Sequence, residues 1–138
     1  MSIPRLAALA LVVSLAAPPP ALAAAPYSAP GPGSLQRRAL LDAIRPEVER
    51  RFGRPIEFVV EHMRVGGGYA FVAVTPQRRG GAEIRNPDEE ADGVHTEAVL
   101  RYVGGRWTVV EQNTGSTDVW YLIHCGRIPD GLIPGGCR

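Results

Sequence analysis

The sequence predicts an α+β fold in which one amphipathic helix packs on a four-stranded antiparallel sheet made of two hairpins. Two patterns lead to this prediction. Apolar residues recur at helical spacing between residues 34 and 53, and four later segments rich in β-branched and aromatic residues are joined in pairs by glycine turns. Beyond the sheet, the chain predicts a short helix and a Gly/Pro-rich tail held by a disulfide.

The helix is predicted to start after Ser34, whose hydroxyl can cap it, and to end at Gly53, where a left-handed cap is expected. Pro46 lies inside this segment and should kink the helix or split it, because proline removes one backbone hydrogen bond. The apolar stripe that should face the sheet consists of Leu41, Ile44, Val48 and Phe52.

The two hairpins are predicted from their turns, Gly66-Gly67-Gly68 and Gly104-Gly105. The strands are expected at residues 56–65, 69–75, 94–103 and 106–111. A long polar loop, residues 77–93, joins the two hairpins. Period-two alternation and the helix stripe together predict one core made of Leu41, Ile44, Val48, Phe58, Phe71, Trp107 and Val109.

The first 23 residues have the pattern of an export signal. One arginine precedes an apolar run, residues 6–17, and Ala21-Leu22-Ala23 follows a proline break. The run is shorter than the roughly 20 residues that span a bilayer, so we expect cleavage after Ala23, or alternatively after Ala24, rather than a permanent anchor. The predicted division is a signal at 1–23, a flexible Pro/Gly-rich linker at 24–33 and one domain at 34–138, in a periplasmic or secreted protein.

The charge balance argues against a nucleic-acid partner. All 15 basic side chains are Arg, and once Arg5 leaves with the signal, 14 Arg face 14 Asp and Glu. A nucleic-acid-binding protein normally carries a basic excess, and a membrane-surface protein carries a basic amphipathic stretch. We therefore expect no nucleic-acid partner, and no membrane partner after signal cleavage.

The chain has two cysteines, Cys125 and Cys137. In an oxidising compartment an even pair usually cross-links, so we predict a disulfide, with two free thiols as the alternative. His124 is adjacent to Cys125 rather than at a zinc-ligand spacing, and the acids of residues 88–92 do not follow a calcium-loop pattern. The sequence therefore predicts no metal site and no cofactor.

The C-terminal part carries the densest group of polar and aromatic residues, Asp118, Trp120, Tyr121 and His124. Val119, Leu122 and Ile123 follow helical spacing, which favours a short helix over a fifth strand. Because Trp and Tyr are enriched at interfaces, this C-terminal cluster is a candidate interaction surface. The alternative is that Asp118 caps the helix and the aromatic rings cover the sheet.

The chain resembles a group of short exported proteobacterial proteins, and its element order resembles cystatin-like and NTF2-like architectures. The segments that carry the resemblance are residues 40–43, 52–60, 68–72, 105–110 and 115–120. The resemblance implies an α+β domain and brings no catalytic residues with it.

We predict an exported, non-catalytic binding or interaction module that uses the open sheet face or the C-terminal cluster. The alternative is a small NTF2-like ligand-binding protein or enzyme with a pocket between helix and sheet. The inward positions inferred above are apolar, which favours a filled core over such a pocket.

Overall fold

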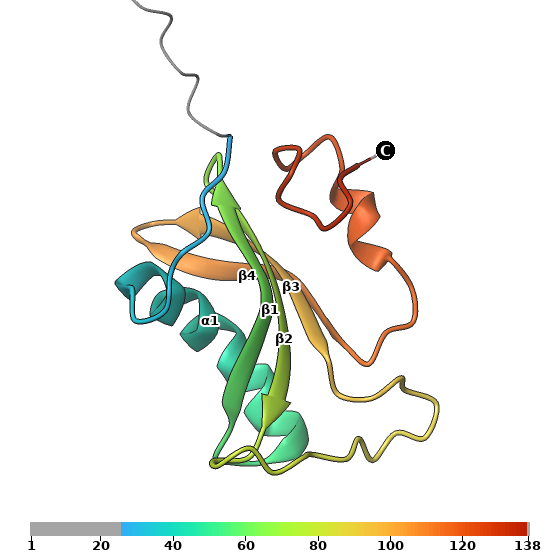
Figure 1. The fold of residues 1–138 in the computed structure, drawn as a ribbon. Helices are drawn as coiled ribbons and strands as arrows, with labels where there is room; N and C mark the ends of the chain where they lie inside the picture. Colours follow the sequence, from blue (N-terminus) through green and yellow to red (C-terminus); the bar gives the residue numbers. More distant parts are fainter. Residues whose placement is uncertain (1–25, 138) are drawn as a thin grey trace, which may run out of the picture.

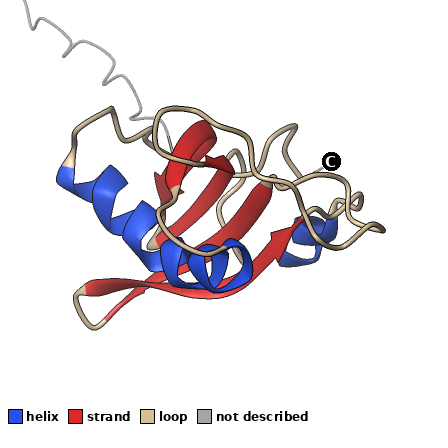
Figure 2. Ribbon diagram, turned by 90° about the horizontal axis from the view of Figure 1, so that it is seen from below, coloured by secondary structure: helices blue, strands red, loops and turns tan. Residues whose placement is uncertain are grey.

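A computed structural model describes residues 26–137, so the predicted signal at 1–23 lies outside the described residues. The elements are α1 (Leu35–Phe52), β1 (Glu57–Gly66), β2 (Tyr69–Gln77), β3 (Thr96–Val103), β4 (Arg106–Thr114) and the 3₁₀ helix η1 (Trp120–His124). The strands form one antiparallel sheet in the order β1-β2-β3-β4. Helix α1 crosses one face of the sheet, and the C-terminal segment lies on the other side (Figures 1 and 2). The α+β class and both hairpins are confirmed.

The ends of α1 follow the sequence closely. The Ser34 hydroxyl accepts a hydrogen bond from the Arg37 amide at 3.2 Å, and the Gly53 amide donates to the Glu49 carbonyl at 2.8 Å with a φ of 77°. The helix is continuous through Pro46, so the predicted split does not occur. Its buried stripe steps by four residues and starts one position earlier than predicted, with Leu40, Ile44, Val48 and Phe52. Within residues 26–137, no helix combines the length and the apolar character needed to span a bilayer.

The prediction of a single core is wrong because Phe71 lies on the other face of the sheet. In β2, Ala70 and Val72 pack toward α1, so the alternation of side chains turns Phe71 away from the helix. Strand β2 is a central strand buried on both faces, so its sequence lacks the polar alternation that would reveal which side chains face the helix. The α1 side of the sheet buries Leu40, Ile44, Met63, Ala70, Val72, Val74, Ala98 and Leu100.

Two β-bulges decide which side chains reach the second face. In β1 the register shifts between Val60 and His62, so Val60 and Met63 both face α1 while His62 turns to the opposite side. In β4 the register shifts where Val99 pairs with Glu111 and Leu100 pairs with Val109. A strict period of two, which the sequence analysis used, does not allow for these extra residues.

The second face of the sheet is covered by the tail, defined as residues 125–137. Phe71 and Val99 from the sheet and Leu132 from the tail are completely buried, at 0% exposure. The sheet therefore has no open face there, contrary to one of the contact surfaces predicted above. The disulfide is confirmed, with the Cα atoms of Cys125 and Cys137 5.5 Å apart, within the usual range for this bond. The five-residue 3₁₀ helix confirms a helical segment rather than a fifth strand.

The segment predicted as a flexible linker is attached to the sheet from residue 26 onward (Figure 1). Ser28 and Val65 exchange two backbone hydrogen bonds of 2.7 and 2.8 Å, which add a short bridge to the edge of β1. The Arg64 guanidinium lies 4.4 Å above the ring of Tyr27. At Gly131, where φ is 87°, an added Cβ would lie 2.6 Å from the Tyr27 ring, so only glycine permits this approach.

Candidate functional site

Three of the four residues in the predicted C-terminal cluster attach η1 to the sheet. The Trp120 indole nitrogen donates to the Glu97 carboxylate at 3.1 Å, and His124 Nε2 lies 2.8 Å from Glu111 Oε2. The Tyr121 ring packs edge-on against Phe71 at a centroid distance of 4.9 Å. These contacts match the alternative in which the aromatic rings cover the sheet.

Asp118, the fourth residue of the cluster, is exposed and stands apart from the other three. Its backbone amide donates to the Ser116 hydroxyl at 3.3 Å, which is a local turn contact. Asp118 does not cap η1, because the residue at the cap position is Val119 and no side chain caps that end. The outer surface of η1 instead carries Val119, Leu122 and Ile123, exposed at 57%, 39% and 67%, and we call these three residues the η1 patch.

Glu97 lies at the centre of the contacts beneath η1. Its burial raises the pKa of the carboxyl, and the Trp120 hydrogen bond and the nearby His95 partly oppose this rise. The Glu61 carboxylate adds to the rise by charge repulsion. The same buried surroundings, together with Glu97, raise the pKa of Tyr121. Because the Trp120 indole donates a hydrogen bond to the Glu97 carboxylate, this carboxylate attaches η1 to the sheet.

Strand β1 holds the tail through two side chains. His62 Nε2 donates to the Leu132 carbonyl at 2.7 Å, and Arg64 Nη1 donates to the Gly131 carbonyl at 2.6 Å. The Phe71 ring lies 5.7 Å from the imidazole. Burial lowers the pKa of His62, the Leu132 hydrogen bond partly offsets this, and the charge of Arg64 lowers it further.

We therefore expect the protein to lose stability as the pH falls through the region below about 6.5, the ordinary pKa of histidine. There the unfolded chain takes up a proton at His62 before the folded protein does, so the free energy of unfolding decreases until the folded pKa is passed. The measurement is urea unfolding of the wild type and His62→Gln, which keeps an N–H donor for the Leu132 carbonyl, between pH 7.5 and 5. The wild type should lose more stability than the variant, and parallel pH profiles would contradict the assignment.

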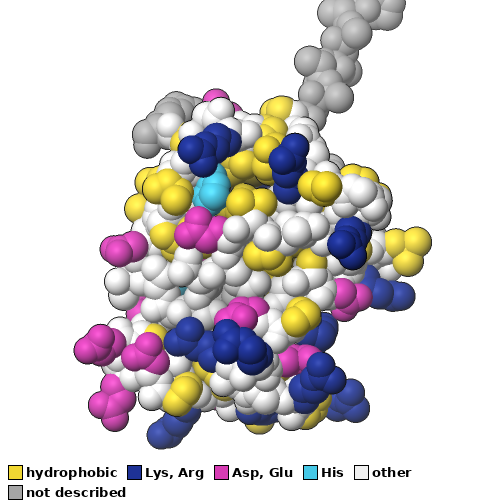
Figure 3. Space-filling model, turned by 180° about the vertical axis from the view of Figure 1, so that it is seen from behind, with side chains coloured by type: hydrophobic (Ala, Val, Ile, Leu, Met, Phe, Trp, Pro, Cys, Tyr) yellow, Lys and Arg dark blue, Asp and Glu magenta, His cyan; other side chains and the backbone are white. Residues whose placement is uncertain are grey.

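The acidic loop between β2 and β3 is exposed, as Figure 3 shows along the lower left edge of the molecule. Its polar groups bind one another and the helix: the Asn86 amide donates to the Gly93 carbonyl at 2.7 Å, and Arg51 lies 3.6 Å from Asp88. Within residues 26–137, no group of three or more His, Cys, Asp or Glu side chains is placed to hold a metal ion.

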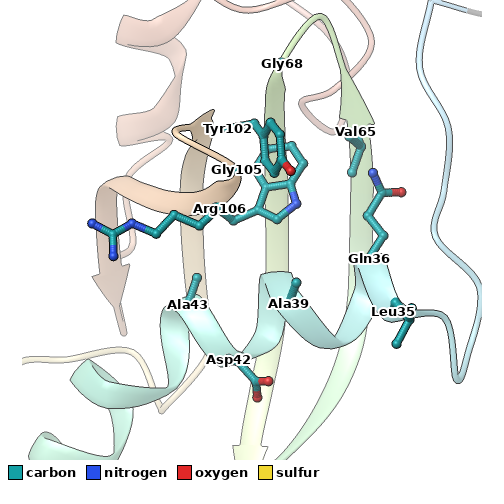
Figure 4. Close-up of a pocket in the computed structure, with 11 residues that line it drawn as sticks. Leu35, Gln36, Ala39, Asp42, Ala43, Val65, Gly68, Tyr102, Gly105 and Arg106 are labelled. Atoms are coloured by element: carbon teal, nitrogen blue, oxygen red, sulfur yellow. The ribbon is translucent and has the colours of Figure 1, made fainter.

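A hollow lies between the first three turns of α1 and the ends of both hairpins, and we call it the α1 groove (Figure 4). Its volume is about 760 Å³, within the range typical of small-molecule sites. Alanines at positions 39 and 43 form the helix wall, and these short side chains leave the space unfilled. The groove is lined by Leu35, Gln36, Ala39, Asp42, Ala43, Val65, Gly68, Tyr102, Gly105, Arg106 and Trp107.

An aromatic pair forms the strand wall of the α1 groove. Tyr102 and Trp107 are direct cross-strand partners beside the Gly104-Gly105 turn, with ring centroids 5.2 Å apart. Tyr102 is 52% exposed, although a side chain of this type usually gains stability from burial. Two further apolar residues near the groove are also exposed, Leu35 at 79% and Val103 at 51%.

The polar residues of the α1 groove lie around this aromatic pair. In Figure 4, Gln36 points along the groove toward Val65, while the Asp42 carboxylate and the Arg106 guanidinium point away from the aromatic rings. Asp42 lies 3.6 Å from Arg45 on the same helix. No carboxylate of the described residues lies within 4.0 Å of the Arg106 guanidinium. The groove thus combines an apolar interior with a mixed polar rim.

Sequence reasoning missed the α1 groove because it placed Trp107 in the core; the side chain does pack in part against that core, but it also lines the groove. One signal was available: a Tyr and a Trp face each other across a two-residue turn, which places both rings at the end of a hairpin. The other wall carried no signal, since alanine inside a helix normally indicates only helix propensity. Comparisons with protein-family models, curated proteins and solved structures find no match to this chain.

Proposed function

We propose that the protein is an exported, non-catalytic binding module and that its ligand occupies the α1 groove. The observation that carries this proposal is the aromatic pair Tyr102–Trp107, which borders an open space of about 760 Å³, although Trp107 also packs in part against the core on the α1 side of the sheet. Larger side chains at Ala39 and Ala43 would fill that space and bury apolar surface. A fold that leaves aromatic surface accessible in a concave site is typical of ligand binding.

The lining supports binding rather than catalysis. It contains no Ser, Cys or His, so no nucleophile lies beside a base within the groove. Its one carboxylate, Asp42, is 59% exposed and lies 3.6 Å from Arg45, so it takes part in an exposed ion pair on the helix surface.

The first test uses two-dimensional NMR of the ¹⁵N-labelled protein with phenol, cyclohexanol and 2-propanol as neutral probes. The chain has two Trp, and their indole N–H signals provide an internal comparison: Trp107 lines the groove, and Trp120 is bound to Glu97. We expect the probes to shift the Trp107 indole and the Ala39 amide and to leave the Trp120 indole unchanged.

The matched variants are Ala39→Leu and Ala82→Leu. Both positions are exposed alanines, but Ala39 lines the groove and Ala82 lies in the loop after β2. Ala39→Leu should abolish the probe-induced shift of Trp107, because leucine occupies the groove, while Ala82→Leu should bind like the wild type. Probe shifts confined to the η1 patch would contradict the groove and favour a protein-interaction surface there.

A further inference from the structure

We propose that the occupant of the α1 groove is the η1 patch of a second copy of this chain, an inference that rests on the proposed function above. Residues 26–137 expose eight large apolar side chains, and six of them lie at these two places. They are the three residues of the η1 patch together with Leu35, Tyr102 and Val103 at the α1 groove. Exposed apolar side chains that gather in this way mark interaction surfaces.

The η1 patch is a preformed apolar ridge. The Leu122 amide donates to the Val119 carbonyl at 3.0 Å, and a turn of this 3₁₀ type places the two side chains in line. On the inner side of η1, Trp120 and His124 bind carboxylates of the sheet, and Tyr121 packs on Phe71. Because these contacts already hold η1 in place, the patch can dock without ordering a flexible segment first.

The α1 groove has the shape that an aliphatic ridge requires. Its alanine wall leaves a hollow, and Tyr102 and Trp107 supply apolar surface beside it. Helix α1 and the C-terminal segment lie on opposite sides of the sheet, so the patch cannot reach the groove of its own chain (Figures 1 and 2). The contact must therefore form between two copies.

The charges beside the two surfaces are complementary. Asp118 directly precedes the η1 patch, Arg106 belongs to the groove lining, and both are exposed. Within the part of the chain that the structure describes, neither has an opposite charge within 4.0 Å, whereas Asp42 of the lining is paired with Arg45. Arg127 follows η1 at the far end of the patch. The charges thus favour one orientation, in which the start of η1 lies toward Arg106.

The first experiment follows association by sedimentation velocity from about 10 µM to about 1 mM, the range expected of a small, transient interface. Each wild-type copy carries both surfaces, so we expect chains of copies that lengthen with concentration. Ile123→Ser, which removes most of the ridge, and Ala39→Leu, which fills the groove, should each stay monomeric. Val59→Ser is the matched control, since Val59 is 46% exposed in β1 outside both surfaces, and it should associate like the wild type.

An equimolar mixture of the two monomeric variants tests the pairing of patch with groove. One intact groove and one intact patch remain, so the mixture should form a complex of two chains that does not grow. With ¹⁵N label on one variant at a time, labelled Ile123→Ser should shift at the Trp107 indole. Labelled Ala39→Leu should shift at the Leu122 amide and not at the Trp107 indole.

Charge reversal tests the orientation. Asp118→Arg and Arg106→Asp should each raise the Kd of self-association at least about threefold, because each replaces an attraction at the interface by a repulsion. Mixing these two variants restores opposite charges for one of the two possible contacts, so the mixture should associate about as tightly as the wild type. No gain on mixing would overturn the orientation.

The outcomes separate this inference from the proposed function. If phenol shifts the Trp107 indole but the wild type stays monomeric throughout, the groove binds ligands and the second copy is overturned as its occupant. If the wild type associates and Ala39→Leu does so equally well, the contact lies outside the groove and the inference is again overturned. If phenol does not shift Trp107 and the wild type does not associate, the proposed function itself fails.

Discussion

Replacing Phe71 with alanine is expected to lower the free energy of unfolding by about 3–5 kcal/mol, the usual cost of truncating a buried aromatic residue. Phe71 is 0% exposed and lies between the sheet and the tail, where its ring contacts Tyr121 and His62. Its removal would leave a cavity bounded by the sheet and by a tail of largely irregular structure. Urea unfolding followed by circular dichroism measures the change.

The comparison for Phe71→Ala is Tyr102→Ala, an aromatic truncation in the neighbouring strand β3. Tyr102 is 52% exposed, so its loss should cost no more than about 1.5 kcal/mol. Phe71→Leu provides a milder change if the alanine variant does not fold, and it should still be clearly less stable than the wild type. Equal costs for Phe71→Ala and Tyr102→Ala would show that the tail does not seal the second face of the sheet.

Removing the disulfide should have the second largest effect. The bond between Cys125 and Cys137 closes a loop within the tail, with a sequence separation of 12. In the chain-entropy model a loop of this size restricts the unfolded state by about 3 kcal/mol. The double variant Cys125→Ala/Cys137→Ala should lose up to about that amount and should show faster amide exchange in the tail than in the sheet.

A reducing agent provides the control for the disulfide experiment. Treatment of the wild type with dithiothreitol should reproduce the lower stability of the double variant, whereas the double variant should not respond. A wild type whose unfolding curve is the same with and without the reductant would contradict a stabilising role for the bond.

The elements that local chemistry determines were predictable from the sequence. Ser34 and Gly53 mark the ends of α1 because a hydroxyl cap and a left-handed glycine are local requirements. The Gly104-Gly105 turn, with φ values of 58° and 80°, sets the second hairpin in the same way. The disulfide followed from the number of cysteines and the predicted compartment.

The remaining features depend on tertiary structure. The bulge between Val60 and His62 moves the later side chains of β1 to the opposite faces of the sheet, and no residue type in this segment predicts it. Phe71 lies in a strand buried on both faces, where the alternation of apolar and polar residues is lost. The α1 groove depends on which helix positions face which strand positions. The role of Ala39 therefore becomes visible only in the structure, where it lines the same groove as Trp107.

The coverage of the second sheet face has a consequence for the timing of folding. Ile128, Leu132 and Ile133, which bury Phe71 and Val99, are synthesised after every strand of the sheet. The tail also contacts Tyr27, which lies only four residues after the predicted cleavage site at Ala23. A chain still emerging from the ribosome can therefore pair its strands but cannot complete this core. The second face of the sheet can pack only after the tail has been synthesised and can contact the segment around Tyr27. Until then, Phe71 and Val99 of the nascent chain stay uncovered on this face.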